Sequence, residues 1–189
     1  MKQGDKTMKF PTVENAALVM IDMQQKLLPA MSEPEKVLNR ASLLVNGMNE
    51  LAVPVVVTEQ YPQGLGNTVP ELSELFAADT KVIAKKSFSC FGEEAFAAAM
   101  DVEKRPVMII AGIESHVCVA QTVLDALNRG FKVFLAADAV SSRKNSDVEI
   151  ALQQLRDAGC VVASAEAILF MLLRTAAHPN FKAISKLVR

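Results

Sequence analysis

Short runs of apolar residues alternate along the chain with longer segments in which apolar positions recur every three or four residues. The short runs predict buried strands, and the longer segments predict amphipathic helices. Strands are expected at residues 16–22, 53–59, 81–85, 107–111, 131–138 and 160–164. Helices are expected at 33–51, 71–76, 93–100, 146–158 and 166–174, and in a segment that follows a turn at Gly112 and ends at Arg129-Gly130.

This alternation predicts an α/β fold with three layers, in which helices cover both faces of a six-stranded, doubly wound parallel sheet. The expected strand order is 3-2-1-4-5-6. We expect one domain over residues 1–189, with a core at about 16–174 and a tail at 175–189. The tail has the pattern of an amphipathic turn or helix that either packs on its own subunit or forms a subunit interface.

Composition and charge exclude several classes of protein. The 189 residues are 51% hydrophobic and 22% charged, with a net charge of −1, which gives no electrostatic basis for binding nucleic acid or an anionic membrane. No apolar run approaches the roughly 18 residues needed to cross a bilayer. The first residues have no apolar core of the kind that a signal peptide requires. A cytoplasmic protein without membrane or nucleic-acid partners is therefore expected.

The cysteines and histidines bear on metals and disulfides. The three cysteines are widely spaced and form no C-x-x-C motif, which argues against a disulfide framework and a thiolate zinc site. The two histidines, His116 and His178, are too few for a histidine-rich centre. We therefore predict no metal and no other cofactor.

Cys118 follows the predicted strand at 107–111 and stands where the next helix is expected to begin. A thiol at a helix N-terminus faces unpaired backbone N–H groups and the positive end of the helix dipole, which favour the thiolate. The position predicts a nucleophile with a lowered pKa.

Two other reactive side chains stand at carboxyl ends of predicted strands. Asp22 ends the first strand and Lys85 ends the third, and ligands bind at this edge of doubly wound sheets. A carboxylate beside Cys118 can accept its proton, and an ammonium group can stabilise both anions. Taken singly, each residue also has an ordinary interpretation, as a strand cap, a solvated lysine or a small buried side chain.

Three segments resemble the signature regions of the isochorismatase-like cysteine hydrolases. They are Ile-Asp22-Met-Gln, Lys85-x-x-Phe-Ser-x-Phe and Gly-Ile-Glu-Ser-His-Val-Cys118-Val, in the order of the family. The resemblance extends over about residues 16–173. Residues 58–66 and 137–143 resemble the branch that contains the isochorismatase domain-containing proteins, whose substrates are poorly defined.

The resemblance implies a mechanism for a small amide or carbamoyl substrate. Asp22 would take the thiol proton, Cys118 would attack the carbonyl, and Lys85 would hold the charges. A cis peptide bond between Ile113 and Glu114 would aim the N–H groups of Glu114 and Cys118 at the oxyanion. Water would then release the acyl-enzyme.

The resemblance also implies a homo-oligomer. It implies no metal, because the nicotinamidase branch has a metal-binding pattern where this chain has Thr-Glu-Gln-Tyr at 58–61. True isochorismatases lack the cysteine.

Four side chains are candidates for substrate contacts: Gln24, Tyr61, Phe88 and His116. Tyr61 belongs to a polar loop at 60–67 that is expected over the site. Phe88 either shields the site or packs in the core, and His116 either lines the pocket or acts as a second base.

Two other functions stay open. One is an interaction module without catalysis on the same scaffold. The other is a redox-responsive protein in which Cys118 is oxidised to sulfenic acid, although no resolving cysteine stands close in sequence.

Overall fold

A six-stranded parallel sheet in the order β3-β2-β1-β4-β5-β6 forms the centre of the molecule, which confirms the predicted class and strand order. The computed structural model describes residues 10–189, and only the backbone of residues 101–103. The strands are β1 (Ala16–Ile21), β2 (Val55–Gln60), β3 (Lys81–Lys85), β4 (Val107–Ile113), β5 (Lys132–Ser141) and β6 (Val161–Ala163). The expectation of no signal peptide concerns mainly residues 1–9, which lie outside the described residues.

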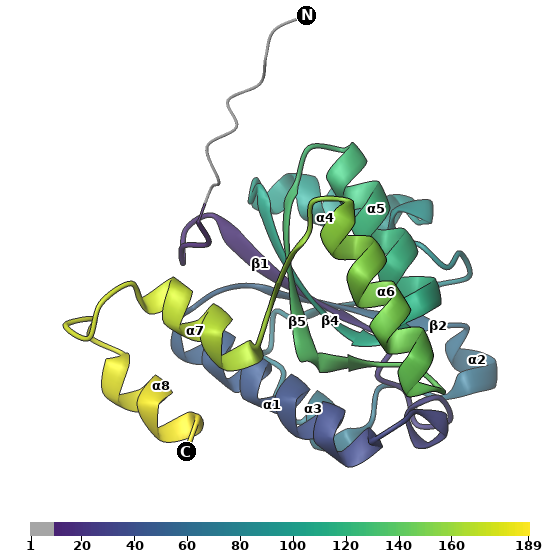
Figure 1. The fold of residues 1–189 in the computed structure, drawn as a ribbon, viewed down its shortest axis with the longest axis horizontal. Helices are drawn as coiled ribbons and strands as arrows, with labels where there is room; N and C mark the ends of the chain where they lie inside the picture. Colours follow the sequence, from purple (N-terminus) through teal and green to yellow (C-terminus); the bar gives the residue numbers. More distant parts are fainter. Residues whose placement is uncertain (1–9) are drawn as a thin grey trace, which may run out of the picture.

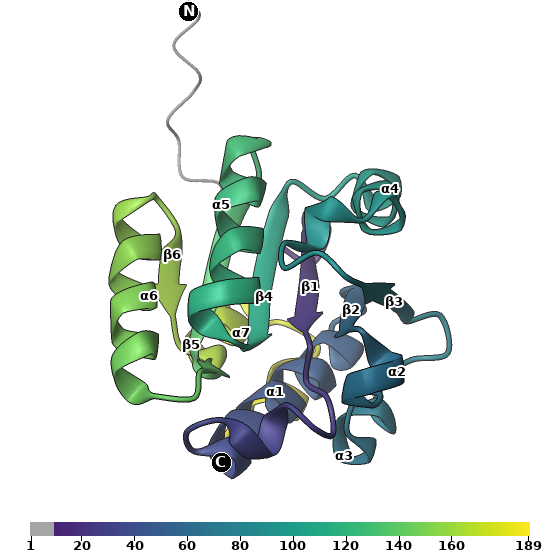
Figure 2. The same ribbon diagram turned by 90° about the vertical axis from the view of Figure 1, so that its right-hand side faces the viewer.

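Helices cover both faces of this sheet. One face carries α1 (Pro34–Glu50), α7 (Ala165–Leu173) and α8 (Phe181–Leu187), and the other carries α4 (Glu94–Glu103), α5 (Ala120–Asn128) and α6 (Asn145–Asp157) (Figures 1 and 2). Short helices lie between them: η1 (Leu28–Ala30), α2 (Pro62–Leu65), α3 (Pro70–Ser73), η2 (Cys90–Gly92) and a π-helical turn, η3 (Ser115–Val119). No helix within residues 10–189 is both long enough and apolar enough to span a bilayer.

The period of two in each strand divides the apolar core between the two faces. In β1, Leu18 and Met20 join the cluster under α1 and α7, whereas Val19 and Ile21 join the cluster under α4, α5 and α6. Because both faces are covered, all six residues of β1 are buried. This double burial explains why central strands such as β1 and β4 are continuous apolar runs in the sequence, whereas the edge strand β3 is largely exposed.

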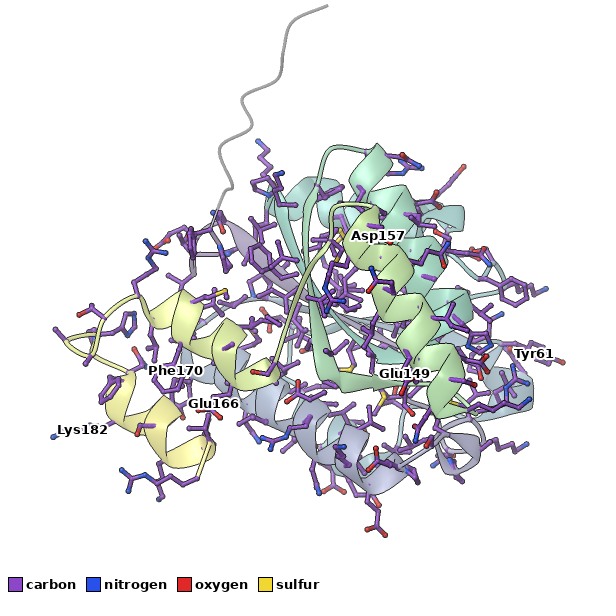
Figure 3. The ribbon with its side chains drawn as sticks, in the orientation of Figure 1. Tyr61, Glu149, Asp157, Glu166, Phe170 and Lys182 are labelled. Atoms are coloured by element: carbon purple, nitrogen blue, oxygen red, sulfur yellow. The ribbon has the colours of Figure 1, made fainter. Side chains whose placement is uncertain are left out.

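The tail packs on its own subunit through α8. Ile184 is fully buried in the cluster under α1, and Asn180 Nδ2 donates a hydrogen bond of 2.8 Å to the carbonyl of Glu50. The rings of Phe170 and Phe181 meet edge to face with centroids 6.3 Å apart, and Figure 3 shows Phe170 on the side of α7 next to α8.

The predicted turn at Gly112 is wrong, because this glycine lies inside β4. It pairs in register with Ile21 of β1, and its φ is +135°. A Cβ atom at Gly112 would lie 2.2 Å from the carbonyl oxygen of Ile21 and 2.6 Å from its nitrogen. The glycine therefore allows the two central strands to approach closely just before each leads into the next segment.

The substitution Gly112→Ala tests this close approach. We expect it to lower the free energy of unfolding by roughly 2–6 kcal/mol, because overpacking and a strained φ each cost about 1–3 kcal/mol. Gly130→Ala is a matched control, since Gly130 also has a positive φ but a Cβ there would meet nothing within 4 Å. Urea unfolding of both variants measures the difference, and equal losses would contradict the steric argument.

Candidate active site

The structure brings Asp22, Lys85 and Cys118 together at the carboxyl edge of the sheet. Asp22 directly follows β1, Lys85 is the last residue of β3, and Cys118 lies in η3 after β4. Their exposed fractions are 0%, 2% and 5%. Because β1 and β4 are neighbours at the point where the strand order reverses, this is the edge at which such sheets bind ligands.

Asp22 is fixed by its backbone and by one of its carboxylate oxygens. Its φ is +56°, and its N–H donates to the carbonyl of Thr58 over 3.1 Å. Oδ1 accepts a hydrogen bond of 2.8 Å from the Thr58 hydroxyl. Oδ2 lies 2.7 Å from Lys85 Nζ and forms a buried ion pair with it. The Cys118 thiol also interacts with this carboxylate.

Lys85 is a fully enclosed ammonium group. Besides Asp22, Nζ contacts Gln60 Oε1 at 2.6 Å and the carbonyls of Phe88 and Ser87 at 3.1 and 3.3 Å. Burial acts to lower the pKa of Lys85, but the Asp22 carboxylate outweighs it and raises the pKa. Lys85 therefore stays protonated, whereas the adjacent Lys86 is exposed.

The expectation of a lowered pKa at Cys118 is wrong. Burial is the main reason that the pKa of its thiol rises to about 12, and the Asp22 carboxylate adds to the rise while the Lys85 ammonium opposes it. Cys118 does lie in the first turn of the continuous helical segment that η3 and α5 form, so its position near the helix start agrees with the expectation and only the direction of the pKa shift does not. In the resting site the sulfur therefore holds its proton.

The expected cis peptide bond between Ile113 and Glu114 is also absent, and no peptide bond among the described residues is cis. The chain turns instead at Glu114, whose φ of 60° and ψ of 57° are left-handed. This conformation redirects a trans backbone from β4 into η3.

Gln24 supports the loop at 60–67 and offers no exposed polar atom to a ligand. It is fully buried, and its Nε2 donates to the carbonyls of Gly66 and Gln60 over 2.5 and 3.0 Å. Its Oε1 accepts a hydrogen bond of 2.7 Å from the Gln60 N–H. The neighbouring Glu59 holds the same loop, because its Oε1 accepts from the N–H and hydroxyl of Thr68 over 2.6 and 2.8 Å.

Tyr61 and Phe88 stand at the surface near Lys85. Their exposed fractions are 51% and 54%, so the core position considered for Phe88 is wrong. The Tyr61 N–H donates to the Lys85 carbonyl over 2.9 Å, and Figure 3 shows its ring projecting outward beside α2. Both residues belong to segments that Lys85 anchors.

His116 joins a polar cluster around Glu114. Its Nδ1 lies 2.9 Å from Ser142 Oγ, and its Nε2 lies 3.9 Å from Glu114 Oε2. Arg143 Nη2 donates to the same carboxylate oxygen over 3.0 Å. Glu114 is thus the partner of both Arg143 and His116.

Thr58 and Gln60 are functional-site residues to which the sequence analysis gave no role. Thr58 binds Asp22, and Gln60 binds Lys85. The available signal was their place at the carboxyl end of β2, next to β1. Among the residues whose side chains are described, no group of three or more His, Cys, Asp and Glu is arranged to hold a metal ion.

Known proteins resemble this chain over most of its length. The family model for the Isochorismatase domain matches residues 16–167. The isochorismatase domain-containing protein 2 of Danio rerio is 38% identical over 177 residues, which are 94% of this chain and 88% of that protein.

Solved structures give the same result. The MAR1 ribonuclease of Caenorhabditis elegans has a TM-score of 0.91 and 36% identity, and the match covers 95% of this chain and 92% of that one. YcaC of Pseudomonas aeruginosa, solved with hexane-2,5-diol and covalent acrylamide, has a TM-score of 0.90 and 27% identity over 97% of this chain and 93% of its own. Escherichia coli YcaC, described as an octameric hydrolase of unknown specificity, has a TM-score of 0.90 and 26% identity over 97% and 91% of the two chains.

The family match thus includes β1, β3, β4 and η3, and with them Asp22, Lys85 and Cys118. Together with the relatives that match along nearly the whole chain, it shows that this protein belongs to the Isochorismatase domain family, whose fold is that of a hydrolase.

Proposed function

We propose that this protein is a cysteine-dependent hydrolase of small amide or carbamoyl compounds. The observation that carries the proposal is the buried contact of Asp22 with Lys85 beside the Cys118 thiol. One carboxylate oxygen accepts a hydrogen bond from Thr58, and the other, which faces Lys85, is the one that would receive the thiol proton. This is the arrangement that a thiol needs when a general base must activate it.

The reaction would proceed through an acyl-enzyme. Asp22 takes the thiol proton as Cys118 Sγ attacks the carbonyl carbon, and the backbone N–H of Cys118 holds the resulting oxyanion. The C–N bond then breaks, and Asp22 returns the proton to the departing nitrogen. Water attacks the thioester with Asp22 again as base, which releases the acid and restores the thiol. Lys85 stays protonated throughout and balances the negative charge of the pair.

The high pKa of Cys118 is compatible with this role. A permanent thiolate next to Asp22 would place two negative charges side by side in a buried site, which burial and repulsion both disfavour. The resting site instead keeps the proton on the sulfur and the negative charge on the carboxylate. The sulfur becomes nucleophilic only as its proton moves to Asp22, so the resting enzyme is protected from other electrophiles.

The relatives support a reactive nucleophile on this scaffold without naming a substrate. Covalent acrylamide in the Pseudomonas aeruginosa YcaC structure indicates a nucleophilic group in that protein. Ribonuclease activity, which is part of the name of the Caenorhabditis elegans protein, is less favoured here. Cys118 and Lys85 are 5% and 2% exposed, so the phosphate backbone of RNA would not reach them without rearrangement.

The rim of the site would set the choice of substrate. Candidates for contacts with the substrate are Phe88, Tyr61 and His116. Gln24 instead holds the loop at 60–67 in place through its hydrogen bonds. Because little of Cys118 is exposed, we expect a small substrate and no bound cofactor. By analogy with the octameric relative, we also propose that this chain forms a homo-oligomer.

The first prediction concerns the nucleophile. In a panel of small amides and carbamoyl compounds, we expect the wild type to release ammonia or amine from at least one compound. Cys118→Ala should abolish that activity, because no other group can form the acyl-enzyme. Cys160→Ala is the matched control, since Cys160 is also a buried thiol but contacts the carbonyl of Val133 instead of Asp22 or Lys85.

Turnover that survives in Cys118→Ala would refute the nucleophile. A complete lack of turnover with well-folded wild type would favour the interaction module. Cleavage of an RNA substrate included in the panel would favour the ribonuclease. A reversible peroxide adduct on Cys118, in place of turnover, would favour the redox-responsive thiol.

The second prediction distinguishes a base from a fixed charge. If Asp22 were only a charge that disfavours the thiolate, Asp22→Asn would lower the pKa of Cys118 and speed its alkylation by iodoacetamide. If Asp22 is the base, the substitution should slow alkylation at pH 7 by about 100-fold, a typical contribution of general base catalysis.

The pH profile gives a second measure of the same role. Wild-type alkylation should level off once Asp22 is ionised. In Asp22→Asn the rate should climb about tenfold per pH unit toward the pKa of the thiol itself, because only the thiolate reacts. Peptide mass spectrometry measures the alkylation rate of Cys118 in the wild type and in Asp22→Asn. Faster alkylation in the variant would exclude Asp22 as the base.

The third prediction concerns Lys85. Lys85→Met should lower the free energy of unfolding at pH 7 by about 3–5 kcal/mol, because it leaves the Asp22 carboxylate buried without its partner. The loss should shrink at acid pH, where Asp22 can take a proton. Lys86→Met is the control, since this neighbour is exposed. Urea titrations at two pH values test the claim, and similar losses in the two variants would count against it.

A further inference from the structure

A chain of buried polar groups lies behind Asp22, and none of its side chains takes part in a bond-making step of the proposed mechanism. It consists of Thr58 in β2, Cys90 in η2 and Thr122 in α5, and all three are fully buried. These residues come from three separate elements on the face covered by α4 and α5. Polar groups in such a place are retained only when they satisfy one another.

The Thr58 hydroxyl has one proton, and its short contact with Asp22 Oδ1, at 2.8 Å, fixes where that proton goes. Its lone pairs face Cys90, whose Sγ lies 3.8 Å from Thr58 Oγ1. Burial raises the pKa of Cys90 to about 11, so its sulfur keeps a proton that it can donate. The proton direction therefore runs from Cys90 to Thr58 and from Thr58 to Asp22.

Thr122 connects the other end of this chain to the nucleophile. Its hydroxyl donates to the Cys118 carbonyl over 2.7 Å and accepts from the Cys90 N–H over 3.0 Å. Its Oγ1 also lies 3.3 Å from Cys90 Sγ. Cys90 thus contacts both the threonine that holds Asp22 and the threonine that holds the backbone of Cys118.

We propose that Thr58 is a positioning residue for Asp22, and that the Cys90 thiol orients the Thr58 hydroxyl for this task. With Oδ1 held by Thr58, the carboxylate cannot rotate freely, and Oδ2 stays against Lys85 where it can receive the thiol proton. The inference rests on the proposed function in one respect, which is that Asp22 is the base.

The hydrogen bond from Thr58 has a second effect. A donor to a carboxylate stabilises its ionised form and keeps its proton affinity low. Without the hydroxyl, Asp22 would hold a proton up to a higher pH and would be less often available as a base. The loss of the Thr58 hydroxyl should therefore shift the acid limb of the pH profile, which is the range in which the rate of Cys118 alkylation rises with pH. A purely structural role would not produce this shift.

The test compares Thr58→Val with Thr58→Ser. Valine keeps the shape of the side chain and removes the hydroxyl, whereas serine keeps the hydroxyl and removes the methyl group. We expect alkylation of Cys118 by iodoacetamide at pH 7 to fall about tenfold in Thr58→Val, as for loss of a hydrogen bond to a charged group. The acid limb should move to higher pH, and Thr58→Ser should stay close to wild type.

Cys90→Ala tests the second half of the proposal and serves if Thr58→Val does not fold. It removes the donor to Thr58, so the acid limb should shift in the same direction by a smaller amount. Cys160→Ala is the matched control, because Cys160 belongs to the same apolar cluster as Cys90 and contacts Val133 instead of Thr58. Thermal melting of each variant checks that it is folded.

Several outcomes would overturn the proposal. A folded Thr58→Val with the wild-type rate and acid limb would refute positioning by Thr58, and equal losses in Thr58→Val and Thr58→Ser would assign the effect to packing. A wild-type profile in Cys90→Ala would refute the role of Cys90. Because alkylation needs no substrate, these results can be interpreted even if the protein hydrolyses none of the amides tested. If Asp22→Asn slows alkylation and Thr58→Val does not, only this inference fails.

Discussion

A buried carboxylate and a buried ammonium group must neutralise each other, because neither can be taken out of water alone without a large cost. The contact of Asp22 with Lys85 meets this requirement, and much of the surrounding structure serves it. Thr58 occupies the other carboxylate oxygen, and Gln60 and the carbonyls of residues 87 and 88 surround the ammonium. The segment after β3 therefore takes its course from the charge that it encloses.

The parallel sheet brings this pair to the thiol. Asp22 and η3 follow two strands that are neighbours in the sheet but far apart in sequence, and Gly112 lets those strands approach more closely than a side chain would allow. The thiol is consequently buried beside an existing ion pair. In the proposed mechanism its reactivity depends on the movement of one proton, in place of a permanent charge stabilised by a helix dipole.

The sequence was sufficient to predict the architecture and the three central residues. Strands buried on both faces are continuous apolar runs, and the parallel arrangement places their carboxyl ends at one edge, so Asp22, Lys85 and Cys118 could be expected together. The thiolate was mispredicted because the argument considered the local helix field and not desolvation, which depends on tertiary packing. The turn at Gly112 was mispredicted because glycine serves equally in turns and in close strand contacts.

Side chains that act through hydrogen bonds were the hardest to assign from sequence. Gln24 stands in a signature segment and was expected to face a ligand, but its amide is used by the backbone of residues 60 and 66. Thr58 stands in an apolar strand and gave no chemical signal of its own. Whether a polar side chain faces a ligand or a neighbouring loop depends on contacts between distant segments, which local patterns do not encode.

The loop at 60–67 has a thermodynamic consequence for recognition. Gln24 holds it from below, and the Glu59 carboxylate holds the following Thr68 through two hydrogen bonds. A ligand that bound beneath such a rim would not have to order it, because the conformational entropy of these residues was already lost during folding. Selectivity at this edge would then come from the preorganised shape of the loop. A compound of the wrong shape would be excluded sterically, because the loop has little freedom to adapt.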